Sequence, residues 1–183
     1  MPNFQNPTGI SSDQSHREQV LKLCEHFKVP LVEDGFEEEM KYFGKCVLPI
    51  KSMDSNGIVI YVGTFSKVLF PGIRVGWIAG SEQLIAEISK IKQCKELSGN
   101  QLGQAAIELF CRKGYFELHT AKMHRVYRKR MQSTLKAINK YFPDHISCTK
   151  PNGGYTIWFS FQTRIAEDQF VQMLADRGVK VSP

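Results

Sequence analysis

Segments with helical periodicity alternate with short strand-like segments along the chain, and this alternation constrains the fold more than any other feature. Residues 13–28 follow the turn and helix-capping residues of "NPTGISSD" and predict a helix. Strands are predicted at 30–33, 58–62 and 74–79, and the run 58–62 is apolar on both faces, as in a strand inside a sheet. The pattern indicates an α/β protein with a mostly parallel sheet. The first helix is expected to bury Val20, Cys24 and Phe27.

The pattern changes in the second half of the chain. Helices are predicted at 82–96, 101–112 and 115–141, and the last is long enough to connect two lobes. A turn at "PNGG" then leads into the strand-like "YTIWFSF", a helix near 167–177 and a strand at 179–181. We therefore expect residues 1–141 to form part of a large domain with its connecting helix. Residues 142–183 would begin a small α+β C-terminal lobe that is thin for an independent core, so we expect a longer parent polypeptide.

Composition excludes several classes of protein. The chain is 42% hydrophobic and 23% charged, and it contains no apolar run near the roughly 20 residues that a membrane span requires. Its five cysteines lie far apart without a Cys-x-x-Cys pair, so the sequence indicates neither a disulfide framework nor a zinc site. With no signal-peptide pattern at the start, we expect a cytoplasmic protein with reduced thiols.

The net charge of +6 allows an anionic ligand or nucleic acid as a partner, because basic residues gather between Lys122 and Lys140. We interpret them instead as the solvated face of a helix, because apolar residues recur between them at helical spacing. This apolar stripe consists of Met123, Val126, Tyr127, Met131, Leu135 and Ile138.

Residues with reactive or ligand-binding side chains are expected where strands end, because parallel α/β sheets bind ligands at that edge. Asn6 is assigned to the end of a first strand, Asp34 to the second, and Thr64 to Lys67 to the third, while Arg74 starts the fourth. Together they supply an amide, a carboxylate, hydroxyls, an amine and a guanidinium. The set is more informative than any single member.

Five motifs in this order resemble the class I/II aminotransferases, which are pyridoxal-phosphate enzymes of fold type I. They are "NPTG" (6–9), "VEDGF" (32–36), "TFSK" (64–67), "PGIRVGW" (71–77) and "PNGGYTIWF" (151–159). The resemblance spans essentially the whole chain and implies the second half of the large domain of that fold. The segment "GYFELHTAKMHRVYRKRMQSTLKAI" (114–138) is similar to the corresponding helix in the aminotransferase-like domains of GntR/MocR-type transcription regulators.

The resemblance implies catalytic roles for Lys67 and Asp34. An aldehyde cofactor needs an amine for a Schiff base, and Lys67 matches the lysine that holds pyridoxal 5'-phosphate. A carboxylate facing the pyridine nitrogen keeps that nitrogen protonated, and Asp34 matches this position. Glu33 should point to the opposite face, because neighbouring residues of a strand do so.

The remaining cofactor contacts also follow from the resemblance. Thr64, Ser66 and Arg74 match the cradle of the cofactor phosphate, and Arg74 can give a bidentate contact. Asn6 matches the residue that hydrogen-bonds the phenolic oxygen of the ring. Many relatives add a tyrosine hydroxyl to that oxygen, but Phe36 stands here and cannot donate.

Two functions are consistent with these residues. The first is an aminotransferase that converts an amino acid into a 2-oxo acid, with Lys67 moving the proton. The second is a cofactor-binding sensor domain of a GntR/MocR-type regulator, which would contact DNA only through an N-terminal winged helix. The resemblance implies a homodimer, and no membrane association is expected because no apolar run is long enough for a membrane span. Arg164, in "FQTRIAED", matches no substrate-carboxylate motif and is not assigned.

Overall fold

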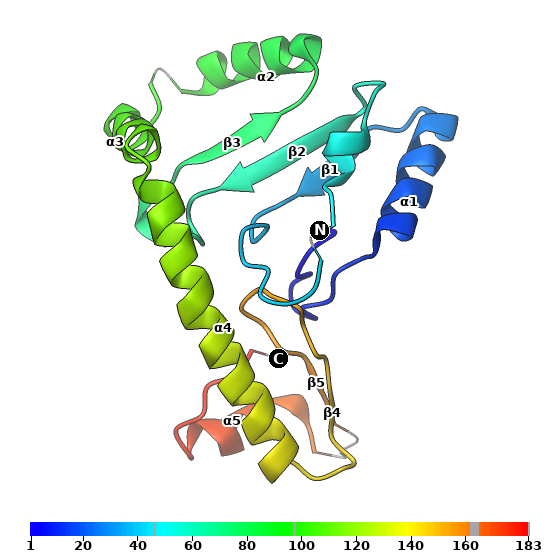
Figure 1. The fold of residues 1–183 in the computed structure, drawn as a ribbon, viewed down its shortest axis with the longest axis vertical. Helices are drawn as coiled ribbons and strands as arrows, with labels where there is room; N and C mark the ends of the chain where they lie inside the picture. Colours follow the sequence, from blue (N-terminus) through cyan, green and yellow to red (C-terminus); the bar gives the residue numbers. More distant parts are fainter. Residues whose placement is uncertain (46, 97, 162–164, 183) are drawn as a thin grey trace.

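A three-stranded sheet lies at the centre of the fold (Figure 1). The computed structural model describes residues 1–45, 47–96, 98–161 and 165–182. The sheet has the order β1 (Leu31–Asp34), β2 (Val59–Thr64), β3 (Gly76–Ala79). β1 and β2 are parallel, whereas β2 and β3 are antiparallel, so the described sheet has one pair of each kind.

The central position of β2 agrees with its apolar sequence. Val59, Tyr61 and Gly63 are buried, and the residues between them are half-buried, so the second face is less covered than the sequence predicts. Tyr61 stacks on Trp77 of β3 with ring centroids 5.1 Å apart. Aromatic packing thus supports the antiparallel pairing.

The first helix, α1 (Gln14–Phe27), begins where the sequence predicts. The Asp13 carboxylate accepts a hydrogen bond from the His16 N–H at 2.8 Å and caps the helix. The expected burial is wrong for Phe27, which is 64% exposed, whereas Leu21 and Arg17 are buried. At about 100° per residue, Phe27 is turned away from the face that Arg17 and Leu21 share.

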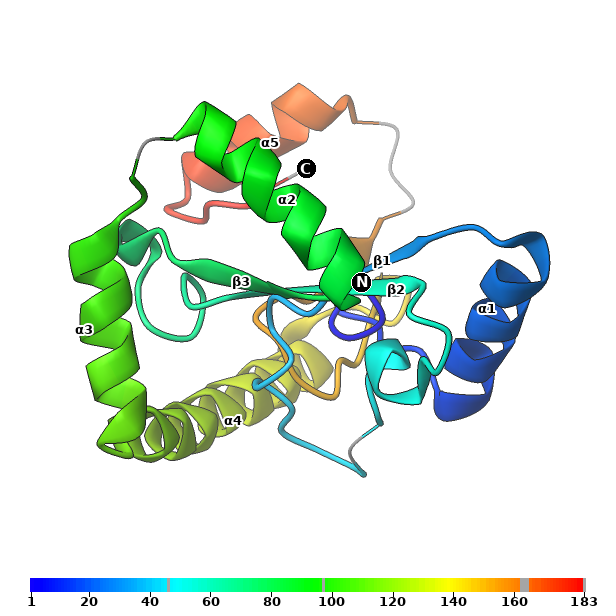
Figure 2. The same ribbon diagram turned by 90° about the horizontal axis from the view of Figure 1, so that it is seen from above.

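The other helices of the large predicted unit also form. They are α2 (Glu82–Lys95), α3 (Gln101–Arg112) and α4 (Tyr115–Tyr141), and the chain adds the short 3-10 turns η1 (Ile50–Met53) and η2 (Pro71–Ile73). Seen from above, α2 and α4 lie on opposite sides of the sheet ribbon, and α3 connects them at one end (Figure 2).

The C-terminal part contains less strand than predicted. β4 (Ser147–Cys148) and β5 (Phe159–Ser160) form a two-residue antiparallel pair, and α5 is Glu167–Ala175. The predicted strand at 179–181 is absent, since these residues have no regular structure. Val179 and Val181 are 48% and 43% exposed, so burial does not reward strand formation there.

The interpretation of the basic segment as a solvated helix face agrees with α4. Met131 and Ile138 are buried and the other members of the apolar stripe are half-buried, whereas the basic residues are exposed. Met131 packs in one core cluster with Met40, Tyr42 and Val68. The long helix is therefore the wall against which the loops after β1 and β2 pack.

Arg17 is a fully buried cation that joins three parts of the chain. Its Nη1 donates to the Leu48 carbonyl at 2.8 Å, and its Nη2 donates to the carbonyls of Pro2 and Ser12 and to Asn3 Oδ1. These bonds fix the N-terminal segment and the loop before η1 onto α1. Buried carbonyl groups are thereby satisfied by one guanidinium.

We predict that Arg17→Ala lowers the free energy of unfolding by about 3 kcal/mol, because it removes a fully buried side chain together with the hydrogen bonds that it donates to Asn3, Ser12 and Leu48. The control is Lys22→Ala, an exposed position on the same helix, which should change it by less than about 0.5 kcal/mol. Urea unfolding followed by circular dichroism measures both. Equal effects for the two variants would contradict the role of Arg17.

Candidate active site

Asp34, the segment 64–67 and Arg74 lie at one edge of the sheet, where β1 and β2 end and β3 begins. Asp34 and Thr64 are the last residues of their strands, and Thr64 lies opposite Gly76. The Phe65 N–H donates to the Val75 carbonyl at 3.1 Å. Because β3 is antiparallel, the residues that precede it lie beside those that follow β2.

The sequence predicted that Arg74 starts the fourth strand, and this prediction is wrong. Arg74 follows η2 in the left-handed conformation with φ 50°, and the strand begins two residues later at Gly76. Its side chain is exposed. The left-handed residue turns the chain from η2 into β3, so Arg74 lies at the same sheet edge as Thr64.

Lys67 lies in a tight turn after β2. The Ser66 N–H donates to Thr64 Oγ1 at 3.1 Å, and the Leu69 N–H donates to the Phe65 carbonyl at 2.9 Å. Lys67 is exposed, while the next residue, Val68, is buried in the core with its carbonyl 2.8 Å from a ring nitrogen of His119 on α4. The turn therefore leaves Lys67 exposed and buries the next residue, Val68, in the core.

Asp34 and Glu33 point to different sides of β1, as expected from strand geometry. Glu33 is 1% exposed and accepts from the N–H groups of Ile50 at 2.8 Å and Lys51 at 2.7 Å. Asp34 is half-buried, and its Oδ1 accepts from the Phe36 N–H at 3.2 Å. Glu33 thus holds η1 in place, and Asp34 belongs to the edge that carries Lys67.

Asn6 does not follow a strand, because residues 1–13 contain no regular element in the structure. It is exposed in a turn that is closed by the Gly9 N–H donating to the Gln5 carbonyl at 2.6 Å. A Cβ on Gly9 would lie 2.7 Å from the Thr156 carbonyl and 3.1 Å from Pro151 Cβ. The "NPTG" and "PNGGY" segments, far apart in sequence, are therefore packed together.

Sequence reasoning missed two residues beside Lys67. Glu37 is 4% exposed, and its Oε2 accepts from the Tyr155 N–H at 3.3 Å. The Tyr155 hydroxyl donates to the Lys67 carbonyl at 3.1 Å. Tyr155 belongs to the "PNGGYTIWF" motif, which predicted a turn and carried part of the family resemblance but gave Tyr155 no role, and Glu37 opens the acidic run 37–39.

Burial raises the pKa of Glu37 from its ordinary 4.5 to about 7, and the Tyr155 N–H and the positive charge of Lys67 oppose this rise. Burial likewise raises the pKa of Tyr155, which stays a neutral hydroxyl. The loop after β1 therefore holds a carboxyl group that changes its charge near neutral pH.

The donor set at this edge fits a phosphorylated aldehyde cofactor. Thr64 and Ser66 supply half-buried hydroxyls and Arg74 an exposed guanidinium, which suit a phosphate dianion. In the part of the chain that the structure describes, neither Lys67 nor Arg74 forms a salt bridge within the protein. Lys67 could bind the aldehyde, and Asp34 could face a protonated ring nitrogen.

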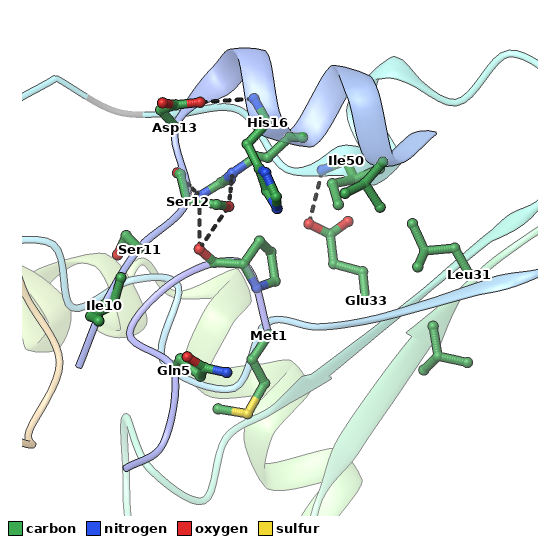
Figure 3. Close-up of a pocket in the computed structure, with 14 residues that line it drawn as sticks. Met1, Gln5, Ile10, Ser11, Ser12, Asp13, His16, Leu31, Glu33 and Ile50 are labelled. Carbon is green, nitrogen blue, oxygen red and sulfur yellow. Dashed lines mark hydrogen bonds between the residues drawn. The ribbon is translucent and has the colours of Figure 1, made fainter. Parts of the chain in front are cut away.

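A separate cavity of about 550 Å³ lies between α1, β1 and the N-terminal segment (Figure 3). Met1, His16 and Glu33 are among its lining residues, and none of the expected cofactor residues is.

No helix among the described residues is long and apolar enough to cross a membrane. No group of three or more potential metal ligands occurs among them either. Arg164 lies outside the described residues.

The family model described as aminotransferase class I and II matches residues 1–183. The chain therefore belongs to the class I and II aminotransferase family. It is 35% identical over all its 183 residues to aromatic-amino-acid aminotransferase 1 of Thermococcus litoralis and spans 44% of that protein. It is 31% identical over 183 residues to the uncharacterized HTH-type transcriptional regulator YisV of Bacillus subtilis and spans 38% of it.

Solved structures give the same fold. The kynurenine aminotransferase of Pyrococcus horikoshii, in complex with PMP, KYN as substrates and KYA as products, superimposes with a TM-score of 0.94. That match has 34% identity and covers 100% of this chain and 45% of the other. The fold is thus that of the aminotransferases, and the chain spans less than half the length of these relatives.

We predict that Glu37 makes the protein more stable at mildly acidic than at alkaline pH. Its folded-state pKa lies above the ordinary value, so its contribution is fully present below pH 4.5 and is lost as pH rises through 7. Between pH 5.5 and pH 8 the loss is about 2 kcal/mol for a shift of this size.

Urea unfolding at the two pH values measures this loss. Glu37→Gln should remove about 2 kcal/mol of the pH-dependent difference, whereas Glu87→Gln, at an exposed position on α2, should leave it unchanged. A difference that survives Glu37→Gln in full would refute the assignment.

Proposed function

We propose that this chain is the lysine-bearing part of a pyridoxal 5'-phosphate-dependent aminotransferase, which transfers an amino group from an amino acid to a 2-oxo acid. The observation that carries the proposal is the exposed Lys67 at the edge where Asp34, Thr64 and Arg74 also lie. The family membership of the whole chain supports it.

Bound at this edge, the cofactor would supply an electron sink that stabilises negative charge on the amino-acid Cα. Asp34 would hold a proton on the ring nitrogen electrostatically. Thr64, Ser66 and Arg74 would bind the phosphate and orient the ring. Lys67 would take the proton from the substrate Cα and return it, acting as general base and then acid.

Phe36 and Asn6 would determine the surroundings of the phenolic oxygen. Asn6 has an amide that can donate a hydrogen bond to that oxygen, and Phe36 has no donor. Phe36 is half-buried, and its N–H is taken by Asp34. In this proposal Phe36 therefore contributes packing to the cofactor site.

The second candidate function is that of a sensor domain. The match of this chain to a transcriptional regulator over all 183 residues favours this function. The same residues would hold the cofactor, and an arriving amine would change the state of an attached DNA-binding segment. Repeated amino transfer between an amino acid and a 2-oxo acid by the whole protein supports the enzyme. Cofactor binding without turnover supports the sensor.

The location and assembly belong to the same proposal. We infer a homodimer, because fold-type-I enzymes build their active sites at a subunit interface. We infer a cytoplasmic location from the sequence, which has no signal-peptide pattern and no paired cysteine spacing. Contact with DNA is included only for a parent protein that carries an N-terminal winged helix. The substrates are amino acids and 2-oxo acids as classes.

We predict that pyridoxal phosphate is trapped on Lys67 by borohydride reduction. The peptide that contains Lys67 should gain one phosphopyridoxyl mass, because the amine attacks the aldehyde and the reduced bond is permanent. Lys67→Ala should abolish the label, and Lys113→Ala, at an exposed lysine between α3 and α4, should not. A label on Lys67 no stronger than on Lys113 in the unmodified sequence refutes the proposal.

We predict that Arg74→Ala weakens binding of pyridoxal phosphate by about 10- to 100-fold, as expected for the loss of a charge-assisted hydrogen bond. Binding of unphosphorylated pyridoxal should change by less than about 2-fold, since the lost partner is the phosphate. Lys92→Ala is the matched control, because Lys92 and Arg74 line one cavity. Equal losses for both ligands would show that Arg74 does not bind the phosphate.

A further inference from the structure

The sequence after Lys67 takes a backbone donor away from two carbonyls of its turn. In a continuing α-helix the Lys67 carbonyl would accept from the N–H of residue 71, and a 3-10 turn would pair Val68 with the same residue. Residue 71 is a proline, which has no N–H. The turn is closed by the Leu69 N–H, which donates to the Phe65 carbonyl at 2.9 Å. Val68 is 3% exposed, so its carbonyl needs a donor from another part of the fold.

His119 of α4 supplies the donor for the Val68 carbonyl. The ring nitrogen Nε2 of His119 lies 2.8 Å from that oxygen. A carbonyl oxygen only accepts hydrogen bonds, so Nε2 carries the proton. Phe116, three residues earlier on the same side of α4, packs edge-on against Phe65 with ring centroids 5.6 Å apart. One side of α4 thus holds the turn by a hydrogen bond and by an aromatic contact.

Tyr155 supplies a donor for the neighbouring carbonyl, that of Lys67. The Tyr155 hydroxyl donates to this oxygen at 3.1 Å, and the ring packs edge-on against Tyr127 of α4 with centroids 4.8 Å apart. Tyr127 lies eight residues after His119 and therefore on the same side of the helix. α4 thus places both donors, His119 directly and Tyr155 through its ring.

The two-glycine turn before Tyr155 is fixed by its backbone. The Gly154 N–H donates to the Met40 carbonyl at 2.8 Å, and a Cβ on Gly153 would overlap the same carbonyl. A Cβ on Gly154 would lie 2.7 Å from Phe4 Cβ, and its φ of 70° is unfavourable for other residues. These contacts do not involve the Tyr155 hydroxyl, so that hydroxyl can be removed without changing them.

We propose that His119 and Tyr155 are positioning residues for Lys67, which hold two consecutive carbonyls of its turn and so fix the point from which its side chain extends. Lys67 is exposed, and a long flexible stem separates its amine from the backbone. A fixed backbone restricts the region that the amine reaches, which favours its encounter with a bound aldehyde. The inference rests on the proposed function of Lys67 and adds two residues to it. Neither residue needs to touch the substrate or the cofactor.

Hydrogen exchange of the Leu69 amide measures the turn in the protein without cofactor, because this N–H closes the turn. Relative to the amides of β2 in the same sample, it should exchange about 5- to 10-fold faster in His119→Leu, as expected for the loss of one buried hydrogen bond. His119→Gln should restore the rate to within about 2-fold, because its side-chain amide can place an N–H where Nε2 lies. His145→Leu, at an exposed position, is the matched control and should leave the rate unchanged.

Tyr155→Phe removes the hydroxyl and keeps the ring, and it should speed the same exchange about 3- to 10-fold. Tyr141→Phe, at an exposed position, is its control and should have no effect. An unchanged Leu69 rate in either variant removes that residue from the proposal, and unchanged rates in both overturn it. His119→Asn replaces His119→Leu if the latter fails to fold, since its shorter side chain does not place an N–H at the position of Nε2.

Capture of pyridoxal phosphate connects the turn to the proposed function. The rate at which Lys67 forms a borohydride-reducible bond at saturating cofactor should fall about 3- to 10-fold in His119→Leu and in Tyr155→Phe, and His119→Gln should recover it. An unchanged capture rate in variants whose Leu69 amide exchanges faster would overturn the positioning role. Absence of the label from Lys67 in the unmodified protein would instead overturn the proposed function, so the two failures give different results.

Discussion

The hydrogen bonds of β2 to both of its neighbours are the constraint on which the rest of the site depends. β2 pairs in parallel with β1 and in antiparallel with β3, and this combination brings two strand ends and one strand start to a single edge. Close approach requires small residues, because a Cβ on Gly63 would overlap the Trp77 ring. The positions of Asp34, Thr64 and Arg74 at this edge thus follow from the backbone pairing of the strands.

The edge combines exposed reactive groups with buried anchors. Lys67 and Arg74 are exposed, but Val68 is 3% exposed and packs with Met40, Tyr42 and Met131. His119 and His124 of α4 contact the carbonyls of Val68 and Lys41. Side chains on short loops are positioned in this way by a packed scaffold, which keeps them accessible.

The shared match to an aminotransferase and to a transcription regulator has a physical explanation. Both proteins match over all 183 residues, so each is similar to the whole of this chain. Holding an aldehyde cofactor requires an amine, a carboxylate and phosphate donors. The reaction that follows depends on how the second ligand is bound, and a fold alone does not determine that.

The sequence by itself determined the helices at 82–96, 101–112 and 115–141, the central strand, and the residue types of the site, because periodicity and turn chemistry are local properties. It could not determine the antiparallel direction of β3 or the exposure of Phe27, since both depend on neighbouring elements. Glu37 and Tyr155 were missed for the same reason. They lie 118 residues apart, and only tertiary packing of the two-glycine turn against the loop after β1 brings the carboxyl group to the Tyr155 backbone and the phenol to the Lys67 backbone.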